Sequence, residues 1–276
     1  MSERPNFSNA GRLASSFTDF LRTERPDLLP QAAQVTVPLT EATTILALRF
    51  ADGVVIAGDR RATQGNLVAM RDIEKVFPTD SHSAVAISGV PGPAMEIVRL
   101  FQTELEYYEK VEGETLSLEG RANHLGRMIR ANLVAAMQGL IVLPLFAGYD
   151  LRRGEGRIFN YDVTGGSYEE ADFHATGSGG LHAKSTLKKL FERAADIDRE
   201  RAIRIALEAL ADAAEEDVAT AGPDPVHGIW PTLFVITAEG VREVPDDEVE
   251  RIANEVLAVR SQVYRSRAQS TRPVGE

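Results

Sequence analysis

Residues 41–66 read EATTILALRFADGVVIAGDRRATQGN and carry the first strong strand signal of the chain. The runs TTILALRF and GVVIAGDRR are apolar and rich in β-branched residues, and Ala51-Asp52-Gly53 separates them. Two such runs around so short a connection predict a pair of strands joined by a tight turn. Thr43 and Thr44 open the first strand, and Asp59-Arg60-Arg61 closes the second. Thr43 is therefore either an ordinary strand residue or the first residue of the working protein.

Residues 1–42 differ in composition from the stretch that follows. They mix prolines with short apolar segments that predict one short amphipathic helix, and nothing in them suggests a core. The prolines are Pro5, Pro26, Pro30 and Pro38, and the apolar residues of the short helix are Leu13, Phe17, Phe20 and Leu21. The composition changes at Thr43, so we expect the folded domain to begin there.

Helical and strand patterns alternate in the rest of the chain. Apolar residues spaced by three and four lie on one face of a helix, whereas short apolar runs predict strands. Helices are predicted around Met95–Tyr108 and Leu125–Met137, at Lys184–Arg193, at about Arg199–Ala219 and from Asp246 to Val259, and strands at IVLPLFAGYD, GRIFNYDV and PTLFVITAEG. Because strands come in groups and helices in pairs, helices must cover the outer faces of sheets. We expect a single layered α+β domain, followed by a flexible tail over 261–276.

Length and charge narrow the class of protein. A chain of 276 residues with 43% hydrophobic content is typical of a folded globular protein. The net charge of -11 argues against a nucleic-acid partner, because proteins that bind phosphate backbones carry a basic face. No apolar run approaches the roughly 18 residues of a membrane span, and the N-terminus MSERPNFSNAGRL lacks the apolar segment of a secretory signal. We therefore expect a soluble protein with no membrane partner.

Residue types and spacing exclude several kinds of site. The chain has no cysteine, which rules out a disulfide framework, a thiolate zinc site and a cysteine nucleophile. None of its histidines has H-E-x-x-H spacing, and no G-x-S-x-G segment is present. The stretch TGSGGLHAKST, residues 176–186, superficially resembles a phosphate-binding loop, but Ser178 and Ala183 stand where that motif requires glycine. The sequence predicts neither a metal nor a cofactor.

Thr43 acquires a chemical role if the chain is cut before it. It would then carry a hydroxyl nucleophile and a free α-amine, whose ordinary pKa of about 7.7–8.0 suits a general base at neutral pH. Such a site needs a nearby cation and a carboxylate that holds the cation in place. Asp59 and Lys75, the latter in RDIEKVF, are the local candidates. Each residue alone also fits a strand or a solvated surface, so only the combination favours catalysis.

Several separated strings in a fixed order are more specific than any single motif. They are TTILALRFADGVVIAGDRRATQGN, RDIEKVF, AISGV, NLVAAMQGL, PLFAGYD, ATGSGG and EEDVATAGPD. With these strings, residues 43–260 resemble the β subunit of the 20S proteasome, an N-terminal-nucleophile hydrolase, in its actinobacterial form. The resemblance implies a threonine endopeptidase with a single-domain, four-layer αββα sandwich. It also implies that residues 1–42 are a propeptide, removed by self-cleavage of the Ala42–Thr43 bond.

The resemblance assigns roles to individual residues. It implies Thr43 as the nucleophile, Asp59 and Lys75 as the charged pair that tunes it, and the Gly89 backbone N–H as the oxyanion hole. Supporting positions near the threonine amine fall on Ser178, Asp217 and Thr220, and the pocket for the residue before the cleaved bond on Ala62, Ile73, Ile87, Pro91 and Met95. All five pocket residues are apolar, so we expect apolar substrate side chains to be preferred there.

Two positions depart from the family pattern. Ala42 stands where the family usually has glycine, and its Cβ restricts the conformations of the bond to be cut. Slower processing, or cleavage before Thr44 instead, therefore stays open. Ala221 lies in a run where glycine is more usual.

The resemblance also implies an assembly in the cytoplasm. Seven copies would form a ring that stacks on a second β ring, flanked by rings of proteasome α subunits. An ATP-driven unfoldase docked on the α rings would supply polypeptide substrates. Two alternatives stay open: a bacterial two-ring relative without α subunits, and a catalytically silent scaffold subunit. The long leader argues against the first, and the retained site residues argue against the second.

Overall fold

The computed structural model of the chain describes residues 43–64 and 67–270, all within one compact unit, 37–276. The expected propeptide with its short helix, and residues 271–276, lie outside the described residues. Within the described part of the chain, no helix combines the length and apolar character of a membrane span.

The first sheet is built around the strand pair predicted from residues 41–66. β1 and β2 are antiparallel, with Phe50 opposite Gly53, so that only Ala51 and Asp52 connect them. In spatial order the sheet contains β10 (Phe173–Gly177), β1 (Thr44–Phe50), β2 (Gly53–Gly58), β11 (Thr232–Thr237) and β12 (Gly240–Glu243). The predicted tight turn is confirmed.

The second sheet is antiparallel throughout and faces the first. Its strands follow the chain order: β5 (Val76–Asp80), β6 (Ser83–Gly89), β7 (Val142–Asp150), β8 (Glu155–Tyr161) and β9 (Ser167–Glu170). A separate hairpin of β3 (Ala62–Gln64) and β4 (Leu67–Met70) follows β2 and precedes β5 in sequence. The strands predicted at IVLPLFAGYD and GRIFNYDV are confirmed as β7 and β8.

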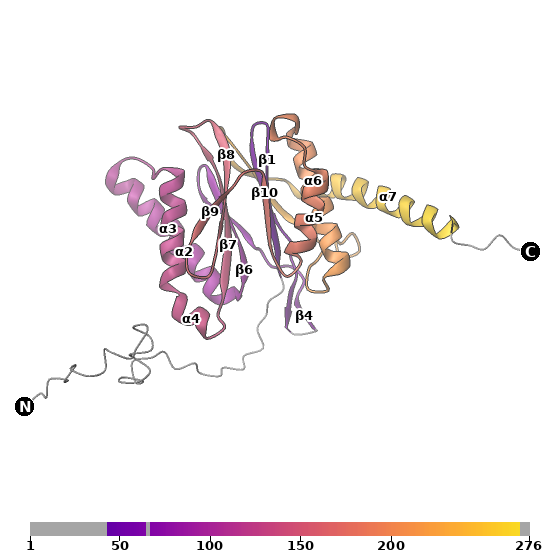
Figure 1. Cartoon of the computed structure of the whole chain (residues 1–276), viewed down its shortest axis with the longest axis horizontal. Coiled ribbons are helices and arrows are strands. Elements are labelled where there is room, and N and C mark those ends of the chain that lie inside the picture. Colours follow the sequence, from indigo (N-terminus) through magenta and orange to yellow (C-terminus); the bar gives the residue numbers. More distant parts are fainter. Residues whose placement is uncertain (1–42, 65–66, 271–276) are drawn as a thin grey trace, which may run out of the picture. The chain divides into compact units, whose positions relative to one another are not determined.

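Helices cover the outer face of each sheet (Figure 1). The second sheet is covered by α2 (Pro91–Glu112) and α3 (Leu118–Ala131), with the short α4 (Leu133–Met137) after them. The first sheet is covered by α5 (Gly180–Leu190), α6 (Arg199–Glu216) and α7 (Asp246–Ser270), with the 3₁₀ turn η3 (Ala194–Asp196) before α6. The four layers confirm the predicted αββα sandwich.

Burial on both faces explains why β1 reads as a continuous apolar run. Ile45 and Ala47 point into the core between the two sheets, whereas Leu46 and Leu48 point into the core between the first sheet and its helices. A strand that is buried on both sides needs apolar residues at every position. The same packing places the start of β1 at the end of the sandwich where β2 also ends.

Several predicted boundaries differ from the structure. The helix expected to continue to Met137 breaks at Asn132, whose backbone leaves the helical region (φ -84°, ψ 3°). The helix expected to reach Ala219 ends at Glu216, because Asp217 is extended and its carboxylate binds the loop that follows. The run PTLFVITAEG supplies the expected strand as β11, which ends at Thr237, and its last residue, Gly240, begins β12.

The C-terminal helix continues beyond the predicted boundary at 260. α7 extends through Ser270, into the segment expected to be a flexible tail. Arg260 forms ion pairs with Asp212 and Glu215 of α6, and the Tyr264 hydroxyl donates to Glu215. These contacts fasten the added turns of α7 to α6.

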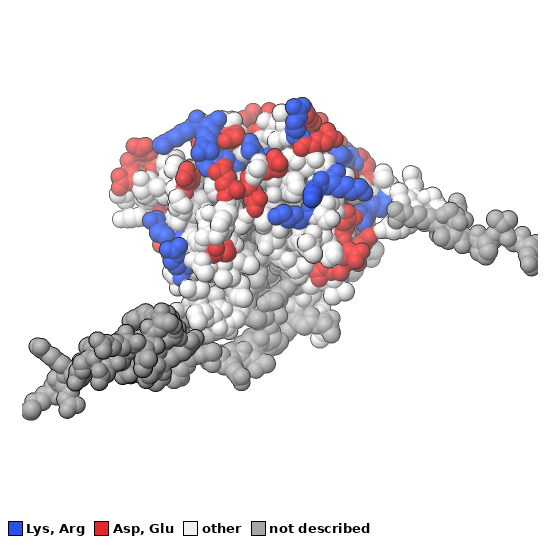
Figure 2. Space-filling model, viewed as in Figure 1, with Lys and Arg blue, Asp and Glu red and all other residues white. Residues whose placement is uncertain are grey.

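Charged side chains are distributed unevenly over the face shown in Figure 2. Acidic and basic side chains are interspersed over its upper part, and its lower part is mostly uncharged. Figure 1 places α4 and β4 at that lower end, where Val134 and Met137 of α4 and Leu67 and Met70 of β4 are exposed. Exposed apolar residues gathered in this way are typical of protein interaction surfaces.

Candidate active site

Thr43 lies where β1 begins and β10 ends. Thr44, the first residue of β1, is paired with Gly177, the last residue of β10. One residue further along, the Ser178 N–H donates to the Thr43 carbonyl oxygen at 2.9 Å. Antiparallel pairing therefore brings Ser178 beside Thr43 from a distant part of the sequence.

Asp59 follows β2 and is surrounded by hydrogen-bond donors. Its Oδ1 accepts from the Thr44 N–H at 2.8 Å and from Lys75 Nζ at 2.7 Å. Its Oδ2 accepts from the Arg61 N–H at 2.9 Å and the Ala221 N–H at 3.0 Å. A buried carboxylate with four donors is fixed in orientation.

Lys75 is held between two oxygens. Its Nζ donates to Asp59 Oδ1 and, at 2.5 Å, to the Arg61 carbonyl oxygen. Burial lowers the pKa of Lys75 below its ordinary value, since desolvation disfavours the ammonium form. The Asp59 carboxylate opposes this effect, and the Arg61 cation adds to it. The lysine thus gives up a proton more readily than a lysine in water.

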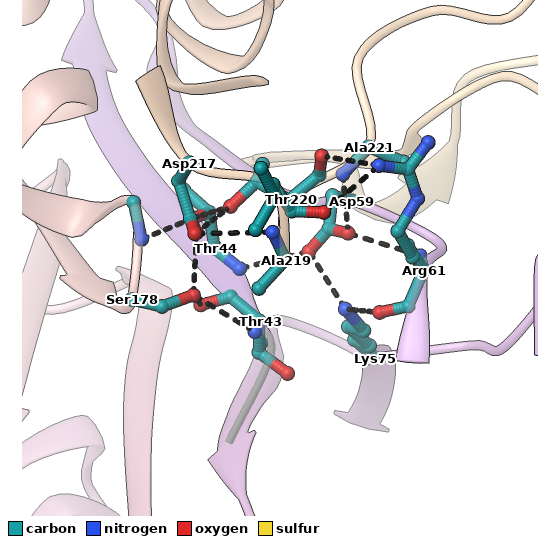
Figure 3. A network of polar contacts seen from close by, with 12 residues as sticks. Thr43, Thr44, Asp59, Arg61, Lys75, Ser178, Asp217, Ala219, Thr220 and Ala221 are labelled. Atoms are coloured by element: carbon teal, nitrogen blue, oxygen red, sulfur yellow. Dashed lines mark hydrogen bonds and ion pairs between the residues drawn. The ribbon is translucent and has the colours of Figure 1, made fainter. Parts of the chain in front are cut away.

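A second polar group approaches Thr43 from the opposite side (Figure 3). Ser178 Oγ donates to Asp217 Oδ2 at 2.6 Å, and Thr220 Oγ1 donates to the same oxygen at 2.6 Å. In the uncut chain, the Thr43 N–H donates to Ser178 Oγ at 3.4 Å. Ser178 thus connects the Thr43 nitrogen to the Asp217 carboxylate.

Asp217 is ionised in this setting. Burial alone would raise its pKa, but hydrogen bonds from Ser178, Thr220 and the Ala219 N–H stabilise the carboxylate, and the pKa lies below its ordinary value. Because a carboxylate can only accept, both hydroxyl groups must direct their protons toward it. One lone pair of Ser178 Oγ therefore remains directed at the Thr43 nitrogen.

Gly89 ends β6 with a backbone conformation that suits glycine (φ +104°). A Cβ at this position would lie 2.1 Å from the Ile141 carbonyl oxygen, so no other residue fits without movement of the backbone. Gly89 and Thr43 line the same small pocket. The backbone of residue 89 is therefore fixed close to the threonine.

That pocket contains all five residues expected to contact the substrate side chain. Its lining includes the expected Ala62, Ile73, Ile87, Pro91 and Met95, together with Thr43, Lys75 and Gly89, and adds Glu74, Ser88 and Ala94. The lining is mainly apolar, and its polar residues are Thr43, Glu74, Lys75 and Ser88. Thr43 therefore borders a mainly apolar pocket.

The glycine-rich stretch at 176–186 contributes to this site. β10 ends at Gly177 and α5 begins at Gly180, so that Ser178 and Gly179 form the connection between them. Ser178, one of the residues that breaks the phosphate-loop pattern, is the residue beside Thr43. In the described part of the chain, no group of three His, Asp or Glu side chains could hold a metal ion.

Sequence reasoning did not assign several residues of the site. Arg61 donates to the carbonyl oxygens of Val218 and Thr220, at 3.1 and 3.2 Å, and so connects the end of β2 to the loop after α6. The sequence shows Arg61 as one of three charged residues that follow β2, but it does not indicate which residues Arg61 binds. The Thr44 side chain and Gly179 were also missed, because each resembles an ordinary strand or loop residue in sequence.

Comparisons with known proteins agree with this geometry. Residues 39–225 match the family described as Proteasome subunit. The chain is 53% identical over 255 residues to a protein named Proteasome subunit beta from Acidothermus cellulolyticus, with 89% of this chain and 87% of that protein covered. It is 52% identical over 249 residues to one of the same name from Streptomyces griseus subsp. griseus, with 88% of each covered. The chain therefore belongs to the proteasome subunit family, has its N-terminal-nucleophile hydrolase fold, and is a threonine-type endopeptidase.

Proposed function

We propose that Thr43 is the nucleophile of this peptidase and that residues 1–42 are a propeptide removed by self-cleavage of the Ala42–Thr43 bond. The observation that carries the proposal is the position of Thr43 between two polar groups and a pocket. Its nitrogen lies 3.4 Å from Ser178 Oγ, while the residue lines the apolar pocket together with Lys75 and Gly89. Once the bond to Ala42 is cut, that nitrogen is an amine.

The free amine of Thr43 acts as the general base for the Thr43 hydroxyl. Thr43 Oγ1 attacks the carbonyl carbon of the substrate, and the hydroxyl proton passes to the Thr43 amine. The Gly89 N–H stabilises the negative oxygen that forms. When the tetrahedral intermediate collapses, the amine nitrogen of the leaving peptide takes the proton and an ester of Thr43 remains. Water then attacks the ester carbon and gives a proton to the same amine. The bond between the acyl carbon and Thr43 Oγ1 breaks, Oγ1 takes the proton from the amine, and the acid product leaves.

Asp59 and Lys75 tune the nucleophile. The ammonium group of Lys75 favours loss of the Thr43 hydroxyl proton and favours the neutral form of the amine. Asp59 holds Lys75 in place through a buried hydrogen bond of 2.7 Å. On the other side, Ser178, Asp217 and Thr220 orient the amine. The six residues thus act as one unit. Asp59 and Lys75 act on the Thr43 hydroxyl and amine from one side, and Ser178, Asp217 and Thr220 orient the amine from the other.

The pocket gives the peptidase its preference for the residue before the cleaved bond. Ala62, Ile73, Ile87, Pro91 and Met95 surround this side chain. A charged side chain would lose its hydration there without gaining a partner of opposite charge over most of the lining. Polypeptides with apolar residues at this position are therefore the preferred substrates.

As a proteasome subunit, the chain assembles with other subunits into a proteasome core. The finer arrangement belongs to the proposal: a ring of seven copies, stacked on a second such ring, flanked by rings of α subunits and supplied by an ATP-driven unfoldase in the cytoplasm. The exposed apolar residues of α4 and β4 support burial of this end of the sandwich against neighbouring subunits.

Intact-mass measurement of the purified chain, alone and after mixing with α subunits, tests the proposal. We expect the mass of residues 1–42 to be lost on assembly and the remaining chain to begin with Thr43. A threonine-directed covalent inhibitor should then label Thr43. The Thr43→Ala variant should assemble, keep its leader and hydrolyse no apolar fluorogenic peptide, whereas Thr43→Ser should keep part of the activity.

Other outcomes would refute parts of this proposal. Turnover by Thr43→Ala, or an active particle that still carries its first methionine, would contradict Thr43 as the nucleophile. A new N-terminus at Thr44 would move the cut by one residue. Native mass spectra that contain active β rings without α subunits would support the two-ring alternative.

A further inference from the structure

Thr44 contacts both polar groups that lie beside Thr43, the Asp59–Lys75 pair and the group around Asp217. Its backbone N–H donates to Asp59 Oδ1 at 2.8 Å, on the side of Lys75. Its hydroxyl accepts from the Gly179 N–H at 3.0 Å and lies 2.6 Å from Thr220 Oγ1, on the side of Asp217. Thr44 and Thr220 are both fully buried, with no exposed surface. These contacts exist although the sequence assigns Thr44 no role in supporting Thr43.

The direction of every hydrogen bond in this group follows from the carboxylate. Asp217 can only accept, so Thr220 donates its proton to Asp217 and has only lone pairs left for Thr44. Thr44 must therefore donate to Thr220, and its own lone pair accepts from the Gly179 N–H. The Thr44 hydroxyl is needed both as a donor and as an acceptor.

The hydrogen bonds form a closed ring. It runs from Thr44 to Thr220, to Asp217, to Ser178, and returns through the peptide bond and N–H of Gly179. A Cβ at Gly179 would lie 2.5 Å from Thr44 Oγ1 and 2.7 Å from Thr220 Oγ1. The ring therefore closes only around a glycine.

We propose that Thr44 is a positioning residue for the reaction, whose hydroxyl holds Ser178 and Asp217 at the Thr43 nitrogen. This inference rests on the assignment of Thr43 as the nucleophile. Thr44 does not touch the reacting atoms. It fixes the connection between β10 and α5, and this connection carries the Ser178 hydroxyl that accepts from the Thr43 nitrogen.

Substitution of the hydroxyl separates this role from simple packing. Thr44→Val keeps the shape of the side chain but leaves the buried Gly179 N–H without an acceptor and Thr220 without its donor. Thr44→Ser keeps both hydrogen bonds and loses one methyl group. Thr79→Val is a matched control. Thr79 is also a buried strand threonine, in β5 of the other sheet, and its hydroxyl lies 2.7 Å from that of Ser83.

The experiment measures kcat and KM of the assembled, processed particle with an apolar fluorogenic peptide. We expect Thr44→Val to lower kcat by about tenfold or more, since a lost buried hydrogen bond is worth roughly one decade, and to leave KM within about twofold because the pocket is unchanged. Thr44→Ser should recover most of kcat. Thr79→Val should keep the wild-type kcat, even if its melting temperature falls as far as that of Thr44→Val.

Each result either supports or overturns the inference. Wild-type kcat in Thr44→Val, equal loss in Thr44→Ser, or equal loss in Thr79→Val overturns it. If Thr44→Val keeps its leader while Thr44→Ser and Thr79→Val lose theirs, the same role is supported at the processing step. If Thr44→Val does not fold, Gly179→Ala tests the same ring with the hydroxyl in place, and a wild-type kcat in that variant overturns the inference. Activity in Thr43→Ala would instead refute the proposed nucleophile, whatever Thr44→Val does.

Discussion

Lys75 Nζ lies 2.7 Å from Asp59 Oδ1, and the exposed fractions of the two side chains are 4% and 0%. An ion pair so deeply buried has lost most of its hydration, so each charge depends on the other. The Thr44 N–H binds the same carboxylate oxygen as Lys75. One oxygen thus connects the start of β1 to the lysine proposed to tune Thr43.

Asp59→Asn should both destabilise the fold and abolish peptidase activity. Removal of one partner from a buried ion pair costs about 3–5 kcal/mol, because the other charge stays buried without compensation. The free energy of unfolding, measured with denaturant, should fall by an amount in this range. Asp52→Asn in the exposed β1–β2 turn is the control and should change it by less than about 0.5 kcal/mol. A stable but inactive Asp59→Asn would contradict the energetic part of this prediction.

Gly89→Ala should abolish turnover without unfolding the protein. The new Cβ would lie 2.1 Å from the Ile141 oxygen, so the end of β6 must shift and carry the proposed oxyanion donor with it. Loss of such a donor lowers kcat by about 100-fold or more. Gly92→Ala, at the start of α2, meets nothing within 4 Å and should keep the wild-type kcat. Equal kcat in the two variants would exclude Gly89 as the oxyanion hole.

Met95→Glu should change the substrate preference. The introduced carboxylate would lie in the apolar pocket, where it would disfavour leucine and pair with lysine at the position before the cleaved bond. We expect the ratio of kcat/KM for leucine and lysine peptides to fall by about tenfold or more, since one unpaired or newly paired charge is worth at least one decade. Leu151→Glu in the exposed turn between β7 and β8 should leave the ratio unchanged. The same ratio in both variants would contradict the assignment of Met95 to the pocket for this substrate side chain.

Asp217→Asn should alter the pH dependence of stability. The pKa of Asp217 is lowered in the folded protein, although burial opposes this, because Ser178 and Thr220 donate to the carboxylate. The resulting stabilisation is fully present above the pKa of an aspartate in the unfolded chain, near pH 4, and is lost as the pH falls through the lower folded pKa. The difference in the free energy of unfolding between wild type and Asp217→Asn should therefore shrink below about pH 4. A difference that stays constant from pH 6 to 3 would contradict this assignment.

Ala42→Gly should accelerate removal of the leader. The Cβ of Ala42 restricts the conformations of the bond proposed to be cut, and glycine lifts that restriction. A time course of intact mass after mixing with α subunits should show faster loss of residues 1–42. Ala33→Gly, elsewhere in the leader, should leave the rate unchanged. Equal rates for Ala42→Gly and wild type would show that another step limits processing.

The sequence by itself determined the strand pair and the side of the site that depends on it. A two-residue turn between apolar runs places Ile45 opposite Gly58, so the start of β1 and the end of β2 lie together. Thr43, Thr44 and Asp59 are neighbours for this reason alone. The five apolar residues that the resemblance assigned to the pocket also lie in one lining.

Only the tertiary structure decided how the other side of the site is built. Ser178 and Asp217 come from segments far along the chain, and β10 must pair with β1 before either approaches Thr43. The ring through Thr44 and Gly179 has no sequence signal, because a threonine in a strand and a glycine before a helix are both common. Its direction is set by the half-buried Asp217 carboxylate, and burial of Thr44 and Thr220 requires that their hydroxyl groups find partners. That requirement acts between residues distant in sequence, so it appears only when the sheets and helices have packed.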